Sequence, residues 1–223
     1  MQRDYENKYF SILGDSISTL EGCNPPECAV FYDRDRRLWA DVIGMADTWW
    51  GQVIEALGGR LLVNHSVSGS TVSRLPFYEL PHYGCSEERA AALSRDGIRP
   101  DVIMILMGVN DHGHRVKVAP TAPAEEGDTS VFSVAYRRML ENLHRLYPDA
   151  ELWCLTLPRY SGVRAAWEES EAERFCRVIS DAALEMGGRV IDLFSSFEPC
   201  ATIDGLHPNA DGMRTISEAV LRF

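Results

Sequence analysis

Residues 9–16 read YFSILGDS, an apolar run that stops at Gly14-Asp15-Ser16. Residues 102–111 read VIMILMGVND and repeat the pattern, since a second apolar run ends at a glycine followed by polar side chains. Short runs of apolar and β-branched residues, bounded by turn residues, are typical of buried strands. We therefore predict parallel strands that lead directly into polar turns.

Five runs of this kind alternate with helical patterns along the chain. We expect strands near Tyr9–Leu13, Arg60–Asn64, Val102–Met107, Glu151–Leu157 and Arg189–Leu193. We expect helices near Leu38–Leu57, Ser86–Ser94, Val131–Tyr147, Ala165–Met186 and Ala210–Leu221. Glycine pairs at 58–59 and 187–188 suit the C-termini of two of these helices. The alternation predicts an α/β fold in which helices cover both faces of a five-stranded parallel sheet, a three-layer α/β/α sandwich.

Length and charge limit the classes of protein to consider. The 223 residues fit one domain spanning positions 1–223, with 45% hydrophobic and 25% charged residues as in an ordinary globular protein. The formal net charge of -11 predicts an acidic surface that repels phosphate backbones and anionic membranes. We therefore expect neither nucleic acid nor a membrane as a partner. The oligomeric state stays open.

The first residues and the cysteines bear on the cellular compartment. The opening residues MQRDYE lack the apolar core of a signal peptide, and no stretch reaches the roughly twenty apolar residues of a membrane span. We expect a cytoplasmic protein. The six cysteines show neither a compact framework nor C-x-x-C spacing, so we expect reduced thiols.

A second polar stretch lies near the end of the chain, where residues 204–208 read DGLHP. Asp204 and His207 join Ser16 to supply the three side chains of a serine hydrolase, in the chain order Ser, Asp, His. A hydroxyl is a weak nucleophile at neutral pH, so it needs an imidazole to take its proton and a carboxylate to orient that imidazole. Taken singly, Ser16 suits a helix N-cap and the other two suit a turn, but together they favour catalysis.

Acyl transfer also needs donors aimed at the developing oxyanion. Three candidates follow predicted strands: the backbone N–H of Ser16, the backbone N–H of Gly69 and the side-chain amide of Asn110. The alternatives are that Asn110 caps a turn and that Gly69 only supplies a positive φ. We assign local structural roles to Asp15 and Asp111, which stand beside two of these residues.

With these residues in place, the chain resembles the SGNH (GDSL-type) hydrolase family, named for its Ser, Gly, Asn and His. Four blocks appear in the family's order, and the resemblance covers nearly the whole chain. It implies a flavodoxin-like sandwich and an SGNH-type serine hydrolase that cleaves carboxylic esters of small molecules. No metal or organic cofactor is expected.

The resemblance also implies a role for each matching residue. Ser16 would be the nucleophile and His207 the base, oriented by Asp204. Gly69 and Asn110 would complete an oxyanion hole with the N–H of Ser16.

Two longer irregular stretches, residues 74–85 and 112–129, are expected to overhang the strand ends where substrate enters. Phe77 and Tyr83 in the first and His112 in the second are candidate substrate-binding residues. The aromatic side chains of the first stretch could stack on a sugar or an acyl chain, or only pin their own loop. Prolines and acidic residues predict a polar rim, which suits a short acyl or O-acetyl group on a small polar or carbohydrate alcohol.

Several alternatives stay open at this stage. The same site would serve a thioesterase, or an acyltransferase in which a sugar hydroxyl replaces water. A protein of another class, a catalytically silent carbohydrate-binding module, could keep the pocket. His112 and His114 are spaced to share a metal ion, but the stretch lacks cysteines or carboxylates at ligand spacing, so no metal site is expected.

Overall fold

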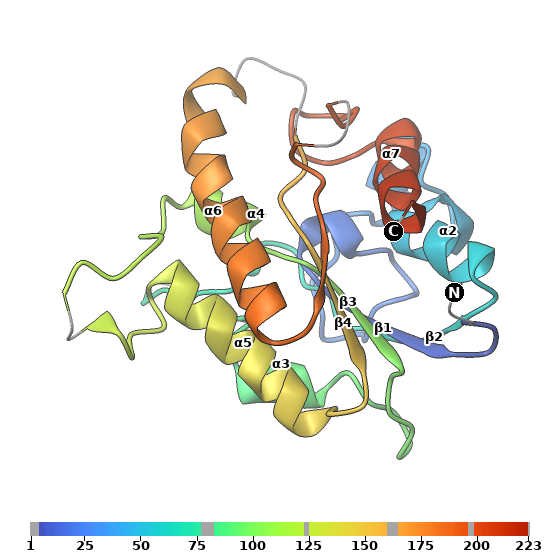
Figure 1. The fold of residues 1–223 in the computed structure, drawn as a ribbon. Coiled ribbons are helices and arrows are strands. Elements are labelled where there is room, and N and C mark those ends of the chain that lie inside the picture. Colours follow the sequence, from blue (N-terminus) through green and yellow to red (C-terminus); the bar gives the residue numbers. More distant parts are fainter. Residues whose placement is uncertain (1–4, 77–82, 123–124, 160–164, 196–198, 223) are drawn as a thin grey trace.

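The computed structural model describes residues 5–76, 83–122, 125–159, 165–195 and 199–222. The chain forms a five-stranded parallel sheet with the strand order β2-β1-β3-β4-β5 (Figure 1). The strands are β1 (Tyr9–Gly14), β2 (Arg60–Asn64), β3 (Val102–Leu106), β4 (Glu151–Leu155) and β5 (Arg189–Ile191). This order is that of the flavodoxin-like doubly wound sheet. The predicted fold class is confirmed.

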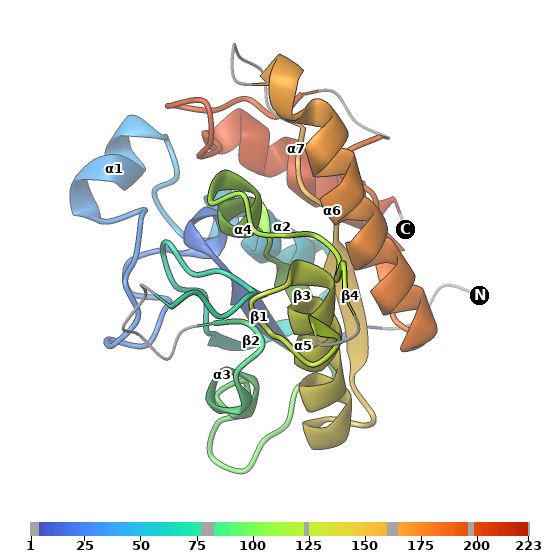
Figure 2. The same ribbon diagram turned by 90° about the vertical axis from the view of Figure 1, so that its left-hand side faces the viewer.

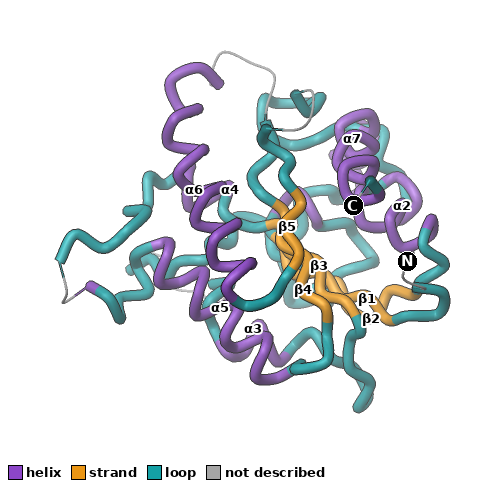
Figure 3. The backbone as a smooth tube through the Cα atoms, viewed as in Figure 1, coloured by secondary structure: helices purple, strands orange, loops and turns teal. Residues whose placement is uncertain are grey.

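Helices cover both faces of the sheet, which is the reason its central strand is apolar throughout. One layer holds α2 (Trp49–Ala56) and α7 (Ala210–Leu221), and the other holds α3 (Glu87–Ala91), α5 (Phe132–Leu146) and α6 (Ala165–Glu185) (Figure 3). Every residue of β3 is buried, because side chains on both of its faces meet a helical layer. In the described part of the chain, no helix is both long and apolar enough to cross a membrane.

The predicted helix over residues 38–57 is wrong. The structure instead has α1 (Arg34–Trp39), a 3-10 turn η2 (Met45–Asp47) and α2 (Trp49–Ala56). Asp41 has a φ of 55°, which ends the helical path, and the Asp47 carboxylate accepts two backbone N–H groups ahead of it. The Thr48 hydroxyl then caps α2 by accepting the N–H of Gly51 at 3.0 Å. Local side-chain capping bonds therefore divide a stretch whose apolar pattern alone suits one helix.

The segment before α2 lies apart from the sheet. Figure 2 shows α1 at the edge of the molecule, beside the loop that follows β1. Asp33 caps the start of α1, because its carboxylate accepts the backbone N–H groups of Asp35 and Arg36. The chain returns to the core through Ala40, whose carbonyl accepts the N–H of Ala210 at the start of α7.

The stretch predicted to be irregular from His112 onward begins inside a short helix, α4 (Val109–Gly113). Gly108 precedes this helix with a φ of 121°, a conformation that residues with a Cβ atom rarely adopt. A Cβ there would also meet Leu157 and Phe132 at 3.2 Å. This glycine therefore lets the chain turn sharply from β3 into α4, which carries Asn110.

Candidate active site

The predicted functional blocks gather at the carboxyl edge of the sheet. Ser16 starts a 3-10 turn, η1 (Ser16–Ser18), two residues after β1 ends. Asn110 follows β3 on α4, and Gly69 lies in the loop after β2. Parallel strands bring their carboxyl ends to one edge, and in open α/β sheets ligands bind in that crevice. The topology thus brings together residues that are far apart in the sequence.

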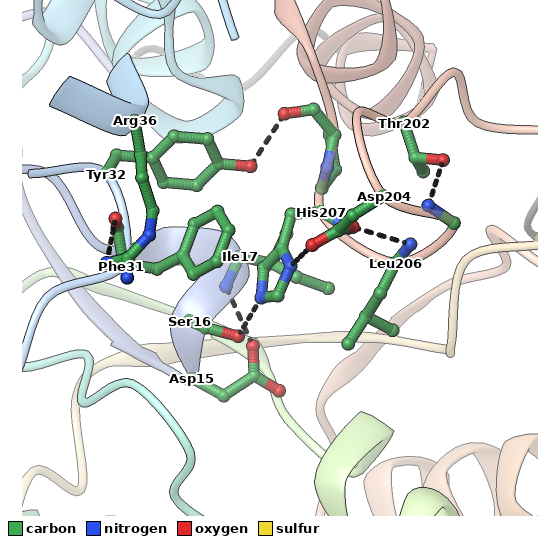
Figure 4. Close-up of polar contacts among 12 residues, drawn as sticks. Asp15, Ser16, Ile17, Phe31, Tyr32, Arg36, Thr202, Asp204, Leu206 and His207 are labelled. Atoms are coloured by element: carbon green, nitrogen blue, oxygen red, sulfur yellow. Dashed lines mark hydrogen bonds and ion pairs between the residues drawn. The ribbon is translucent and has the colours of Figure 1, made fainter. Parts of the chain in front are cut away.

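A continuous hydrogen-bonded chain joins Ser16, His207 and Asp204 (Figure 4). The Nε2 atom of His207 lies 3.0 Å from the Oγ of Ser16. Its Nδ1 atom lies 2.6 Å from the Oδ2 of Asp204. A hydroxyl, an imidazole and a carboxylate linked in this sequence form the arrangement that activates a serine for nucleophilic attack.

The turn that carries Asp204 and His207 is closed by its own hydrogen bonds. The second carboxylate oxygen of Asp204 accepts the backbone N–H groups of Leu206 at 3.0 Å and His207 at 2.8 Å. Gly205 has a φ of 86° and donates its N–H to the hydroxyl of Thr202 at 3.1 Å. These bonds fix the carboxylate relative to the imidazole, so the spacing of three residues in the sequence becomes a defined geometry.

Burial and neighbouring charges set the protonation of this pair. Burial lowers the pKa of His207 below its ordinary value of 6.5, the Asp204 carboxylate opposes that shift, and the Arg36 guanidinium adds to it. Burial alone would raise the pKa of Asp204, but the hydrogen bonds from His207 and Leu206 bring it below its usual range. At neutral pH the imidazole is therefore neutral and the carboxylate is charged.

Asp15 shapes the turn that presents Ser16. Its Oδ1 accepts the N–H of Ile17 at 3.1 Å and so caps η1. The side chain is fully buried, and burial raises the pKa of Asp15 to about 7, against the opposing charge of Arg89. This contact agrees with the local structural role that the sequence suggested.

Arg89 is a residue of the site that the sequence did not single out. It is only 1% exposed although it carries a guanidinium, and it lies on α3. It donates to the carbonyl of Gly14 at 2.8 Å and to the carbonyl of His65 at 2.9 Å. One side chain thus ties the end of β1, just before Ser16, to the loop after β2 that carries Gly69.

The two candidate oxyanion donors beyond Ser16 are also linked to each other. The side-chain amide of Asn110 donates to the carbonyl of Ser70 at 2.8 Å. Ser70 follows Gly69, whose φ is 80°. The amide of Asn110 therefore holds the loop in which Gly69 lies.

Asp111 strengthens the same connection. Its two carboxylate oxygens accept the N–H of Val72 at 2.7 Å and the N–H of Ser73 at 2.9 Å. Burial raises the pKa of this carboxyl, although the backbone bonds oppose the shift. Asp111 therefore clamps the loop after β2 onto α4, as expected for a structural role.

Phe31 contacts His207, the predicted base, and Tyr32 contacts the residue after it, from a segment that no sequence pattern singled out. The ring of Phe31 stacks on the imidazole of His207 with centroids 3.4 Å apart and planes 9° apart. The hydroxyl of Tyr32 donates to the carbonyl of Pro208 at 2.6 Å. In the sequence this pair appears only as two adjacent aromatic residues at the end of the run CAVFY, ahead of a charged stretch.

The predicted substrate-binding residues Tyr83 and His112 lie in different surroundings. Phe77 lies outside the described residues. Tyr83 is partly buried and packs against the hydrophobic core. The ring of His112 lies edge-on to Phe175 of α6 at 5.5 Å between centroids. Their roles in binding substrate stay predictions.

From the sequence we expect neither a metal site nor disulfides. Within the residues that the structure describes, no three His, Cys, Asp or Glu side chains gather as a metal site would require. All six cysteines lie in the described part of the chain, and no two of them are joined by a disulfide.

The fold and these contacts define the class of the protein, a serine hydrolase built on a flavodoxin-like sheet. The family model for the GDSL-like lipase/acylhydrolases matches residues 8–184, and the chain belongs to that family. The predicted family and the predicted enzyme class, a carboxylic ester hydrolase, are confirmed. The matched region contains the Ser16, Gly69 and Asn110 blocks and ends before Asp204 and His207.

Solved structures share the whole fold. A GDSL-like lipase from Bacteroides ovatus ATCC 8483 is 26% identical, with a TM-score of 0.73 and 98% of each chain covered. A GDSL-like lipase from Bacteroides uniformis ATCC 8492 is 25% identical, with a TM-score of 0.73, over 97% of this chain and 94% of that one. An acetyl xylan esterase from Geobacillus stearothermophilus is 21% identical with a TM-score of 0.60, over 97% and 94% of the two chains. No curated protein matches the sequence.

Proposed function

We propose that this enzyme hydrolyses esters of short acyl groups, such as O-acetyl groups on a small polar or carbohydrate alcohol, through an acyl intermediate on Ser16. The observation that carries the proposal is the unbroken chain of hydrogen bonds from the Ser16 hydroxyl through His207 to Asp204. A binding module would have no use for a base held at hydrogen-bonding distance from a buried hydroxyl. The two hydrogen bonds have the geometry that nucleophilic catalysis demands.

In the first half of the reaction, the Oγ of Ser16 attacks the ester carbonyl while the Nε2 of His207 takes the hydroxyl proton. The carbonyl oxygen becomes an oxyanion, and Asp204 stabilises the imidazolium that forms. The C–O bond to the alcohol then breaks, and His207 gives its proton to the leaving oxygen. The acyl group is left as an ester on Ser16.

In the second half, water replaces the alcohol. The Nε2 of His207 takes a proton from water as the water oxygen attacks the acyl-Ser16 carbonyl. Collapse of the second oxyanion breaks the bond to Oγ, and His207 returns the proton to Ser16. The acid is released and the free enzyme is restored.

The oxyanion would be met by the backbone N–H groups of Ser16 and Gly69 and by the side chain of Asn110. An amide NH₂ carries two hydrogens, and one of those on Asn110 is donated to the carbonyl of Ser70. That bond fixes the plane of the amide, so the second hydrogen has a defined direction before substrate binds. Such preorganisation is what makes an oxyanion donor effective.

The proposed substrate class rests on the small exposure of the reacting residues and on the polar loop after α4. Ser16 is 5% exposed and His207 is 9% exposed, so both are largely shielded from solvent. In the loop after α4, Lys117 pairs with Glu125 and also donates to Thr121, so this loop is polar. A shielded serine favours small acyl groups, and polar loops favour a polar alcohol. The fold shared with an acetyl xylan esterase is compatible with this choice.

A series of p-nitrophenyl esters tests the substrate class. We expect kcat/KM to peak between the acetyl and butyryl esters and to fall for octanoyl and palmitoyl esters measured below their solubility limits. Each extra methylene gains at most about 1 kcal/mol where the pocket has room, and it costs more where the pocket is full. A maximum at octanoyl or beyond would refute the assignment. An acetyl thioester and an added sugar acceptor in the same assay show whether thioester cleavage or acyl transfer dominates.

A further inference from the structure

We propose that the adjacent residues Phe31 and Tyr32 are positioning residues that hold the base to the nucleophile. The proposal rests on the function proposed above. It begins with the face-to-face contact between the rings of Phe31 and His207, 3.4 Å apart at their centroids (Figure 4). The two residues lie in the loop before α1, outside the blocks that predicted the site.

The stack restrains a motion that the hydrogen bonds leave open. The imidazole of His207 is bonded at Nδ1 to Asp204 and at Nε2 to Ser16, so both bonds lie close to the plane of the ring. Such bonds oppose a sliding of the ring within its own plane. They oppose only weakly a rotation of the ring about the line that joins its two nitrogens. A ring packed parallel to the imidazole opposes that rotation, because tilting it would drive one edge into Phe31.

The stack also favours the charged form of the base. Two neutral rings prefer an offset or edge-on arrangement to a close face-to-face one. A cation prefers the π face, and the imidazole of His207 becomes a cation when it takes the proton of Ser16. The Phe31 contact is therefore stronger in the transition state than in the resting enzyme, which is the condition for an effect on kcat.

Tyr32 fixes the backbone of the same turn. Its hydroxyl donates to the carbonyl of Pro208 at 2.6 Å, and its side chain is fully buried. Phe31 thus restrains the ring of His207 while Tyr32 restrains the next residue in the chain. The two contacts come from adjacent residues and act on adjacent residues.

The other end of this connection reaches the nucleophile. The N–H of Phe31 donates to the hydroxyl oxygen of Thr19 at 2.9 Å. The hydroxyl of Thr19 donates in turn to the carbonyl of Ser16 at 2.9 Å. A path of two hydrogen bonds therefore runs from the Ser16 turn to the backbone of Phe31, whose side chain reaches His207.

The charges near Phe31 are paired. Arg36 lies 5.2 Å from the centroid of the Phe31 ring, and its Nη1 is 2.8 Å from the carboxylate of Asp33. The Asp33 carboxylate reduces the repulsion between the guanidinium and the imidazolium of His207 without cancelling it, since Arg36 still lowers the pKa of His207. The π face of Phe31 acts in the opposite direction and stabilises the protonated imidazole.

The test compares steady-state kinetics on p-nitrophenyl acetate for variants of the full chain. Phe31→Leu keeps an apolar side chain but removes the π face, and we expect kcat to fall about 3- to 30-fold with KM within about twofold. Phe31→Tyr restores the ring and should keep at least about half of the wild-type kcat. Tyr32→Phe loses one hydrogen bond and should lower kcat about 2- to 5-fold. Trp39→Leu, an exposed aromatic residue on α1, is the matched control and should be unchanged.

Kinetics alone would not separate every cause, so the His207 ring is also observed directly. In protein labelled with ¹⁵N-histidine, Phe31→Leu should shift the ring signals of His207 and Phe31→Tyr should leave them near their wild-type positions. Unchanged ring signals in Phe31→Leu would overturn the proposal, whether or not the enzyme turns over the test ester. Unchanged kcat in Phe31→Leu, equal losses in Phe31→Tyr and Phe31→Leu, or a rise in KM alone would also overturn it. If wild type were inactive or Ser16→Ala fully active, the proposed function itself would fail.

Discussion

Three side chains act on different properties of the His207 imidazole. Asp204 fixes its tautomer, since the Nδ1–H is held by the carboxylate and Nε2 is left to accept the proton of Ser16. Burial and Arg36 lower its pKa, and Phe31 covers one of its faces. As the proposed base, His207 must be neutral in the resting enzyme and must bear a positive charge briefly during attack. Its surroundings suit both states.

The lowered pKa of His207 predicts the acid limb of the pH profile. The base works only in its neutral form, so kcat/KM should rise with pH through the pKa of the free enzyme. Because burial and Arg36 hold that pKa below its ordinary value, the midpoint should lie below about 6.5. Arg36→Gln removes the charge and should move the midpoint upward. A wild-type midpoint above 7 would contradict this description of the base.

Asn110 should affect the chemical step more than substrate binding. We expect Asn110→Ala to lower kcat by about 10² to 10³ with little change in KM, because an oxyanion donor acts mainly on the transition state. The variant also loses the bond to Ser70, so its thermal unfolding is measured beside wild type. A raised KM with kcat intact would make Asn110 a binding residue instead.

At the scale of secondary-structure elements, α3 supports the site through one buried cation. Arg89 reaches from α3 to the carbonyls of Gly14 and His65, and so links the turns after β1 and β2. A buried guanidinium costs desolvation energy, which is recovered only while its acceptors are in place. Burial lowers the pKa of Arg89 to about 10, which leaves it charged at neutral pH.

Removing this cation should destabilise the fold. We expect Arg89→Leu to lower the free energy of unfolding by about 3 to 5 kcal/mol, because the buried carbonyls of His65 and Gly14 each lose this donor and the buried Asp15 loses its neighbouring cation. Chemical denaturation measures the effect. The control is Arg214→Leu on α7, which breaks an exposed ion pair with Asp211 and should cost at most about 1 kcal/mol. Equal effects of the two substitutions would mean that Arg89 is not a structural link.

The sequence predicted the elements best where apolar periodicity and turn residues agree. The strands after which Ser16 and Asn110 lie are short apolar runs ended by glycine, and both are present as expected. The helix over residues 38–57 failed because Asp41 and Asp47 form local backbone contacts that an apolar count does not register. Capping of this kind depends on which side chain lies within hydrogen-bonding distance of which N–H group, and that is set by the folded structure.

At the scale of the whole molecule, the parallel sheet converts four separate sequence blocks into one site. Ser16, Asp204 and His207 could be proposed from sequence because each occurs in a short pattern with a chemical reason behind it. Phe31 and Arg89 could not, because each contacts site residues that are far away in the sequence and neither belongs to a local motif. The proposed catalytic residues occur in recognisable sequence motifs, whereas the residues that position them are recognised only from their contacts in the folded structure.

The central claim is that Ser16 carries the acyl group. The most direct measurement is labelling with a fluorophosphonate, followed by peptide mapping by mass spectrometry, alongside turnover of p-nitrophenyl acetate. We predict that the wild type is labelled at Ser16, and that Ser16→Ala is folded, unlabelled and about 10³-fold or more slower. Labelling at any other residue, or a Ser16→Ala variant that keeps a tenth of the wild-type activity, would contradict the account.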